Sequence, residues 1–396
     1  MFLSPKIQLN IVLVLFIMAN LINMIFPKGM GYGEQAGFAY QLSKFVYGLS
    51  IILMMPSLLS SKRYYFETMR YMAFYVIIHI IFAVVLDFKF DMGSILKTLM
   101  ICISFVFFEE KLAVVKLNKY LLIAFMLSVL INVSYLVLTQ NRLGSAIEND
   151  GRIGGGQGIA NSLIYLLPLL FMKFEGKWAS YLYVFGFIVV LVSLRRTSIL
   201  AYLFCIPFVY RHLKRNISKK YIVVAVAILS VIVWYIVTRY WYVIEMRFSD
   251  TFEASDSGYY GSGRTGWWMV LVHNLFQSPQ HWLQGFGLGQ VAQHMAKAGF
   301  PFGSAHNDYL EVGYTYGIIG LILWYGTMWK LYALSNKKEH VQHARIIRMA
   351  VLSYLLIAFF SGATHNVLFV CIAVFAGLVL NNRDWKRKII LKYVKL

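Results

Sequence analysis

The chain has 396 residues, of which 59% are apolar and 17% aromatic, and its formal net charge is +20 at pH 7. With a mean hydropathy of +0.64, this composition lies outside the range of soluble globular domains and makes a lipid bilayer the relevant solvent. The lysines and arginines fall in short clusters between apolar runs rather than along one face. This pattern is typical of membrane topology, so we predict no nucleic-acid partner.

Twelve apolar runs are long enough, or nearly long enough, to cross a bilayer. They cover residues 7–26, 38–60, 69–87, 93–108, 117–139, 159–173, 178–194, 197–210, 221–238, 309–330, 346–362 and 364–380. The first run is too long for a signal peptide and lacks a clear cleavage site, so it is predicted to be a membrane helix. The sequence therefore predicts an all-α polytopic membrane protein of about 12 transmembrane helices.

The distribution of positive charge predicts the orientation, because basic loops are retained in the cytoplasm. Most of the 37 lysines and arginines lie at Lys6 and within 62–70, 111–119, 173–177, 211–220, 330–348 and 383–395. These segments fall on one side of the predicted membrane helices. Both termini are therefore predicted to be cytoplasmic.

Two outer connections divide the chain. The first nine helices occupy 1–238 and include a short outer loop at 139–158, and the last three helices with a basic tail occupy 309–396. Between them, residues 239–308 form an outer loop of about 70 residues, far above the usual loop length. Apolar residues recur at helical spacing from Trp267 to Phe276. This predicts an amphipathic helix at the outer membrane surface, with Trp267 and Trp268 in the headgroup layer.

Arginines stand out at two places on the predicted outer side. Arg195 and Arg196 separate two apolar runs, where basic residues are unfavourable unless they face an anion or an aqueous cavity. A guanidinium binds phosphate oxygens in bidentate fashion, which makes pyrophosphate the natural candidate. Snorkelling to lipid headgroups is the alternative interpretation of the pair. Arg264 lies in a glycine-rich turn that leads into the predicted surface helix, within reach of a lipid-linked phosphate.

His306 lies where the large loop ends and the tenth helix begins. An imidazole that titrates near neutral pH can accept a proton from a hydroxyl group. Helix capping explains its neighbours: Asn307 or Asp308 would cap the helix, and Glu311 would close a capping box with Asp308. Capping does not explain His306.

Several other kinds of site are not indicated. The three cysteines, Cys102, Cys205 and Cys371, lie inside apolar runs without metal-ligand spacing, so they are predicted to be small core residues. The sequence holds no Walker loop, HExxH, GxSxG, DxD or nicotinamide fingerprint. We therefore predict neither a metal nor a cofactor. The run Gly285–Gly289 follows no strand and is predicted to form tight turns.

Five motifs occur in a recognisable order. They are Ser193-Leu194-Arg195-Arg196-Thr197, Ser262-Gly263-Arg264 with Trp267 and Trp268, Gly285-Phe286-Gly287-Leu288-Gly289, His306-Asn307-Asp308-Tyr309-Leu310-Glu311 and Gly317-Ile318-Ile319-Gly320. Over roughly residues 150 to 325 the chain resembles the O-antigen polymerase and O-antigen ligase superfamily. The resemblance implies a GT-C-like membrane glycosyltransferase of the bacterial inner membrane, with a periplasmic active site and an undecaprenyl-pyrophosphate-linked glycan as donor.

The resemblance also implies roles for individual residues. Arg195 or Arg196, together with Arg264, would hold the donor pyrophosphate and stabilise the leaving group. Arg152 and Asn161 would line the donor cavity. His306 would orient or deprotonate the acceptor hydroxyl. The remaining site candidates are Asn307, Tyr309 and Glu311. The second arginine and the paired tryptophans depart from the simplest family pattern, so the motif does not select between Arg195 and Arg196.

Three functions remain open at this level. A polymerase, which the Gly-x-Gly-x-Gly and HNDYLE segments favour, would transfer the growing chain to a new lipid-linked repeat unit, and a chain-length regulator is then an implied partner. A ligase would transfer the completed glycan to lipid A core. A lipid-linked oligosaccharide flippase would also have about twelve helices, but it does not need so large an outer loop.

Overall fold

The computed structural model describes 3–25, 34–60, 62–87, 92–140, 160–174, 177–193, 195–216, 264–299, 305–337, 340, 343–360 and 367–381, with isolated residues between 227 and 245. Within these ranges, the side chains of Arg196 and Arg264 are among those that are not described.

Eleven of the twelve predicted runs form helices. They are α1 (Pro5–Ile25), α2 (Glu34–Leu59), α3 (Glu67–Val85), α4 (Met92–Val114), α5 (Lys119–Gln140), α7 (Ser162–Lys173), α8 (Lys177–Val192), α9 (Arg196–Asn216), α14 (Asp308–Leu334), α15 (Ala344–Phe360) and α16 (Val370–Leu380). Most of the one remaining run, residues 221–238, lies outside the described residues. The described part of the large outer loop contains three further helices, α11 (Arg264–Phe276), α12 (Pro279–Gln284) and α13 (Gln290–Lys297).

The described helices have the length and surface of membrane helices. Five of them, α1, α2, α3, α5 and α14, contain stretches long and apolar enough to cross a bilayer, and α7, α8, α9 and α16 are shorter apolar helices. Helix α3 shows the lipid-facing type of surface most clearly, since Ile81, Phe82 and Val85 are 57%, 59% and 73% exposed. Such a row of exposed apolar side chains is stable only in lipid. The protein is an all-helical polytopic membrane protein, and its orientation remains a prediction.

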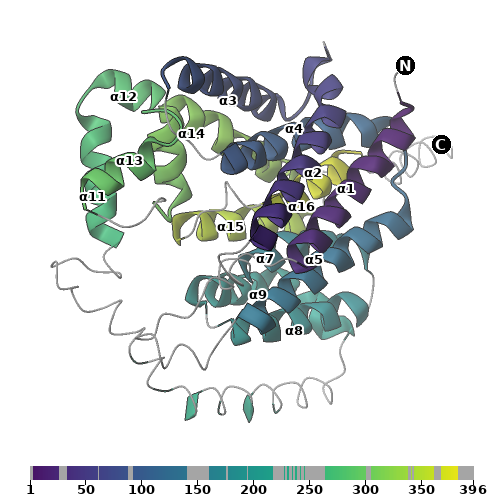
Figure 1. The fold of residues 1–396 in the computed structure, drawn as a ribbon. Coiled ribbons are helices and arrows are strands. Elements are labelled where there is room, and N and C mark those ends of the chain that lie inside the picture. The colour runs from purple at the N-terminus through teal and green to yellow at the C-terminus, as the bar shows by residue number, and fades with distance from the viewer. Residues whose placement is uncertain are drawn as a thin grey trace.

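Helix α4 is central to the bundle and packs against α2, α3 and α16 (Figure 1). Its residues from Met100 to Phe108 are all fully buried, which explains why this run is apolar around its whole circumference. Cys102, Cys205 and Cys371 are buried and free. The prediction that they are core residues is confirmed.

Helices α11, α12 and α13 form a separate unit, here called the outer unit (residues 264–299), which lies beside α14 and α3 (Figure 1). The unit has its own apolar core, in which Trp267, Leu271 and Leu275 of α11 pack with Val291 and Met295 of α13. The predicted helix in the loop is therefore present.

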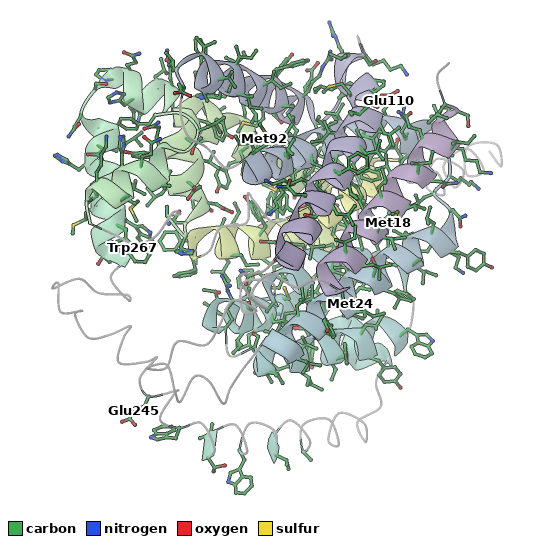
Figure 2. All side chains as sticks on the ribbon, in the orientation of Figure 1. Met18, Met24, Met92, Glu110, Glu245 and Trp267 are labelled. Atoms are coloured by element: carbon green, nitrogen blue, oxygen red, sulfur yellow. The ribbon has the colours of Figure 1, made fainter. Side chains whose placement is uncertain are left out.

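The side chains of Trp267 and Trp268 pack against the protein, and their position in the headgroup layer stays a prediction. Trp267, at one end of α11 (Figure 2), is only 6% exposed. The indole Nε1 of Trp268 donates to the carbonyl oxygen of Ala305 at 2.9 Å. The other side of α11 carries the exposed residues Met269 and Phe276. Helical spacing correctly identified a helix, but both of its faces carry apolar side chains, so the pattern could not show which face is buried.

The outer unit is attached to α14 at a break in that helix. Gly317 has φ of 64° and ψ of −164°, which interrupts the helical backbone. Next to this break, the amide of Phe286 donates to the carbonyl of Tyr314 at 2.7 Å, and the amide of Gly287 donates to that of Thr315 at 3.1 Å. Amides of the Gly285–Gly289 turns thus bond to carbonyls beside the break, as a low-dielectric environment requires.

Side chains reinforce the same attachment. The Asn274 amide donates to the Tyr314 hydroxyl at 3.3 Å, and a ring nitrogen of His294 contacts that hydroxyl as well. Burial, followed by the nearby charges of Lys297 and His281, lowers the pKa of His294. The lowered pKa favours the neutral imidazole at pH 7, which can accept a hydrogen bond from this hydroxyl.

Only glycine fits at the two closest backbone approaches. A Cβ atom on Gly317 would lie 2.3 Å from the carbonyl oxygen of Leu283, and a Cβ on Gly285 would lie 2.6 Å from the amide nitrogen of Gly317. We predict that Gly317→Ala destabilises the protein by about 1–3 kcal/mol, because it combines a positive φ with a backbone clash. Thermal unfolding of the purified protein in detergent measures this change.

Gly48→Ala provides the matched control, because a Cβ on Gly48 of α2 meets no atom within 4 Å. That substitution should leave the melting temperature unchanged or raise it, as alanine favours a helix interior. Equal melting temperatures for the Gly317→Ala and Gly48→Ala variants would contradict the proposed attachment.

Candidate functional site

His306 is held in place by bonds on both sides of it in the chain. On one side, the amide of Ala305 donates to Oε2 of Glu311 at 2.8 Å, and the carbonyl of Ala305 accepts from Trp268. On the other side, Oδ1 of Asn307 accepts from the amide of Leu310 at 3.1 Å. Every partner of Ala305 and every other residue in this set is part of α14, its cap or the outer unit, so the attachment of the outer unit also positions His306.

The backbone of His306 is itself in an unusual conformation. Its φ is 50°, one of two positive values among the described non-glycine residues. Such a conformation costs about 1–3 kcal/mol and persists only where the surroundings enforce it. The imidazole is half-buried, with its ring centroid 6.1 Å from that of Trp267. A strained, partly accessible imidazole beside an aromatic wall fits a binding or catalytic position better than a packing position.

The capping prediction is confirmed in one respect and corrected in another. Asn307 is the N-cap of α14 and its side chain accepts the expected amide. The Glu311 carboxylate instead accepts from the amide of Ala305, two residues before the cap. It thereby fixes the backbone just before His306, which a simple capping box would not do.

Tyr309 packs between α14 and α15. Its hydroxyl donates to the carbonyl of Leu355 at 3.3 Å, and its ring stacks on Tyr325 at 4.5 Å between centroids. These contacts give the residue a packing role in the described structure.

Arg195 immediately precedes α9. Its Nε donates to the hydroxyl of Thr197 at 3.1 Å, and its side chain is half-buried. Arg152 lies outside the described residues, and so do the side chains of Arg196 and Arg264. Of the four predicted pyrophosphate ligands, the structure therefore describes the side chain of Arg195 alone.

Asn161 lies close to this end of α9. Its Oδ1 accepts from the hydroxyl of Ser198 at 2.6 Å, and Asn161 and Ser198 are 2% and 0% exposed. The bond joins the start of α7 to the first turn of α9, three residues after Arg195. Asn161 and Arg195, which lie 34 positions apart in the sequence, thus belong to one part of the structure.

A row of tyrosines connects this region to the start of α14. Ring contacts run from Tyr165 to Tyr354 at 6.5 Å, from Tyr354 to Tyr325 at 6.3 Å, and from Tyr325 to Tyr309 at 4.5 Å. The row crosses α7, α15 and α14. It places polar groups through a part of the protein that is otherwise apolar.

Tyr165 and Asp308 were not predicted as functional residues. Asp308 is fully buried in the first turn of α14, where the helix dipole favours a negative charge. The Tyr165 hydroxyl lies within electrostatic range of both the Asp308 carboxylate and the Arg195 guanidinium. Among the described residues this buried hydroxyl has no hydrogen-bond partner, although such a group normally has one. In the sequence, Tyr165 could have been noticed as a lone hydroxyl-bearing ring within the apolar stretch Ser162–Lys173.

The comparison with protein families matches the same part of the chain. The family model for O-antigen ligase matches residues 181–325. This range begins in α8, includes Arg195, the whole large outer loop and His306, and ends within α14. No curated protein matches the chain.

The role of Glu311 as a positioning residue can be tested by hydrogen exchange. Glu311→Ala removes the acceptor for the Ala305 amide, a loss of about 1–3 kcal/mol at a buried bond. We predict that amides of the peptide containing 305–310 then exchange roughly 10-fold faster or more, as measured by mass spectrometry. Glu311→Gln keeps an acceptor oxygen and should restore protection. Equal exchange in the alanine and glutamine variants would show that this bond does not order the segment.

Proposed function

We propose that this chain, whose residues 181–325 match the O-antigen ligase family model, polymerises lipid-linked oligosaccharide repeat units into O-antigen or a related surface polysaccharide. In this proposal the donor is an undecaprenyl-pyrophosphate-linked glycan, the site faces the periplasm, and the bacterial inner membrane holds the enzyme. The observation that carries the proposal is the strained, doubly anchored His306 at the start of α14 within the matched range.

The proposed reaction needs a group that accepts a proton and a group that stabilises a leaving anion. A hydroxyl oxygen of the acceptor sugar attacks the anomeric carbon of the donor and forms the new glycosidic bond. The bond from that carbon to the pyrophosphate oxygen breaks, and polyprenyl pyrophosphate leaves with the electron pair. His306 accepts the hydroxyl proton. This division of labour requires no metal, since arginines supply the positive charge.

Arginines are suited to the leaving group because their charge persists at all relevant pH values. We assign this role to Arg195 or Arg196 and to Arg264, with Arg152 as a further ligand. Arg195 supports the assignment by its half-buried position and by its electrostatic contact with Tyr165. Asn161 holds the start of α7 against α9 and is proposed to shape the donor cavity from beneath.

Lipopolysaccharide ligation is the second candidate, because the matched family is described as O-antigen ligase. Ligase and polymerase would share donor, fold and leaving group, and would differ in the acceptor. The acceptor would be lipid A core for the ligase and a lipid-linked repeat unit for the polymerase. A flippase is disfavoured because it would make no glycosidic bond and would have no use for a strained histidine.

Substitution of the two central residues tests the chemistry. We predict that His306→Ala and Arg264→Ala each reduce polymer formation by about 100-fold or more, so that the ladder on a lipopolysaccharide gel disappears while protein levels stay normal. Lys297→Gln is the control, since Lys297 is an exposed cation of the same outer unit. Wild-type ladders in both alanine variants would remove the assigned roles.

The deletion phenotype distinguishes the two enzyme functions. For a polymerase we predict lipid A core that carries a single repeat unit. For a ligase the core would carry none, and lipid-linked polymer would accumulate. Silver-stained gels of lipopolysaccharide, together with extraction of lipid-linked glycan, measure both products. The second pattern would reject the polymerase proposal in favour of the ligase.

A further inference from the structure

A cavity of about 300 Å³ opens between helices at the end of the bundle opposite the candidate site. Helix α7 runs from the candidate site to the cavity, because it starts next to Asn161 and ends at Lys173, which lines the cavity. The cavity is formed where α4, α7 and α16 end and α5 begins. Its lining residues are Leu112, Val115, Lys116, Leu117, Leu122, Leu169, Met172, Lys173, Leu378 and Asn381.

The lining combines apolar side chains with two positive charges. Seven of these residues are Leu, Val or Met, the charged residues are Lys116 and Lys173, and Asn381 is the remaining polar group. Lys116 is exposed and Lys173 is half-buried. A third lysine, Lys119, lies within electrostatic range of Lys173. No acidic side chain among the described residues lines the cavity.

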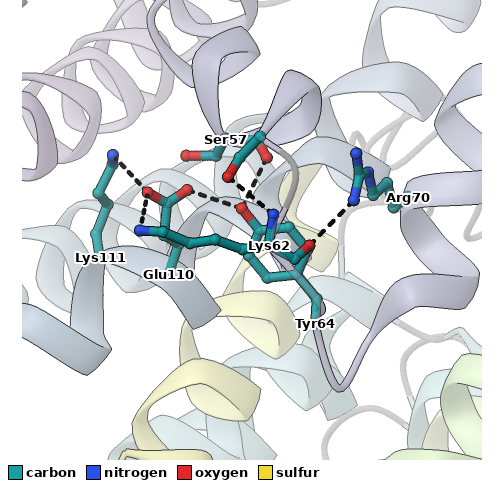
Figure 3. A network of polar contacts seen from close by, with 7 residues as sticks. Ser57, Lys62, Tyr64, Arg70, Glu110 and Lys111 are labelled. Atoms are coloured by element: carbon teal, nitrogen blue, oxygen red, sulfur yellow. Dashed lines mark hydrogen bonds and ion pairs between the residues drawn. The ribbon is translucent and has the colours of Figure 1, made fainter.

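The nearest acidic residues of α4 are bound elsewhere. Figure 3 shows Glu110 in contact with Lys62, Lys111 and Tyr64, at 3.6, 3.3 and 3.0 Å. Burial raises the pKa of Tyr64 to about 12, so its hydroxyl keeps the proton that it donates to this carboxylate. Glu109 accepts from the backbone amides of Tyr65 and Phe66. Both carboxylates therefore serve the turn between α2 and α3. In the described part of the chain, neither Lys116 nor Lys173 forms an ion pair.

Exposed aromatic residues mark the level of the headgroups at this end. Tyr120, next to Lys119, is 81% exposed, and Trp178, at the start of α8, is 68% exposed. Tyrosine and tryptophan concentrate at the membrane interface, where an apolar ring and a polar tip are both accommodated. The mouth of the cavity is thus expected at the headgroup layer of the leaflet that the charge pattern predicts to be cytoplasmic.

We propose that this cavity binds an anionic phospholipid, with its phosphate on Lys116 and Lys173 and an acyl chain along the leucines and Met172. Basic pockets between membrane helices on the cytoplasmic side are suited to acidic lipid headgroups. The charge is complementary because, within the part of the chain that the structure describes, two lysines line the cavity and no acidic side chain does. A free phosphate ion would satisfy the lysines but would leave the apolar part of the lining in contact with water. The proposal concerns the opposite face from the glycan site and does not depend on the function proposed above.

Native mass spectrometry of the full-length protein in neutral detergent tests the proposal. We expect phosphatidylglycerol to bind more tightly than phosphatidylcholine with the same acyl chains. The Lys116→Gln/Lys173→Gln double variant should bind phosphatidylglycerol roughly 30-fold more weakly, since each surface lysine contributes about 1 kcal/mol to an anionic lipid. Lys6→Gln is the matched control, because Lys6 is an exposed lysine on the same predicted face.

Two further measurements identify the occupant. Leu117→Trp fills part of the apolar lining without changing the charge, so it should also weaken phosphatidylglycerol binding. Inorganic phosphate at millimolar concentration should not displace the lipid. The proposal is overturned if both phospholipids bind equally, if the double lysine variant binds like Lys6→Gln, or if inorganic phosphate competes as well as the lipid does.

Discussion

The structure around the candidate site depends on a backbone contact between the outer unit and the break in α14. A helix interior in a membrane normally satisfies its own carbonyl groups, and a break leaves some of them without an internal partner. Here the amides of Phe286 and Gly287 bond to the carbonyls of Tyr314 and Thr315. Because Gly285 and Gly317 lack side chains, the two backbones can approach closely enough for these bonds. The outer unit is consequently fixed at a defined position along α14.

That fixed position determines the surroundings of His306. With α11 held along the first turns of α14, Trp268 reaches the carbonyl of Ala305, and Trp267 lies beside the imidazole. Glu311 and Asn307 complete the hold on the segment. The surrounding contacts can then hold the His306 backbone at a positive φ despite its conformational cost. A group fixed in this way is preorganised, which is the property that proton transfer from a bound sugar hydroxyl to His306 would require.

The two ends of the bundle use charge in opposite ways. At the candidate site, the buried carboxylate of Asp308 and the guanidinium of Arg195 are both within electrostatic range of the Tyr165 hydroxyl, which has no hydrogen-bond partner among the described residues. At the other end, Glu109 and Glu110 interact with residues at or beside the turn between α2 and α3. They do not pair with Lys116 and Lys173 of the cavity. Charge is costly in a membrane protein unless it is paired or used. A ligand with a phosphate group is proposed for each end.

The sequence by itself determined the membrane helices, because the length of an apolar run needed to cross a bilayer depends on bilayer thickness alone. It also narrowed the cap of α14 to Asn307 or Asp308 and indicated the turns at Gly285–Gly289, which are local backbone properties. Only the tertiary structure decided that Trp267 faces inward, that Glu311 bonds to Ala305, and that Asn161 meets Ser198. These features join residues through space, and neither a hydrophobic period nor a short motif specifies which distant side chain will be the partner. The location of His306 could thus be found from sequence, whereas the contacts that hold it could not.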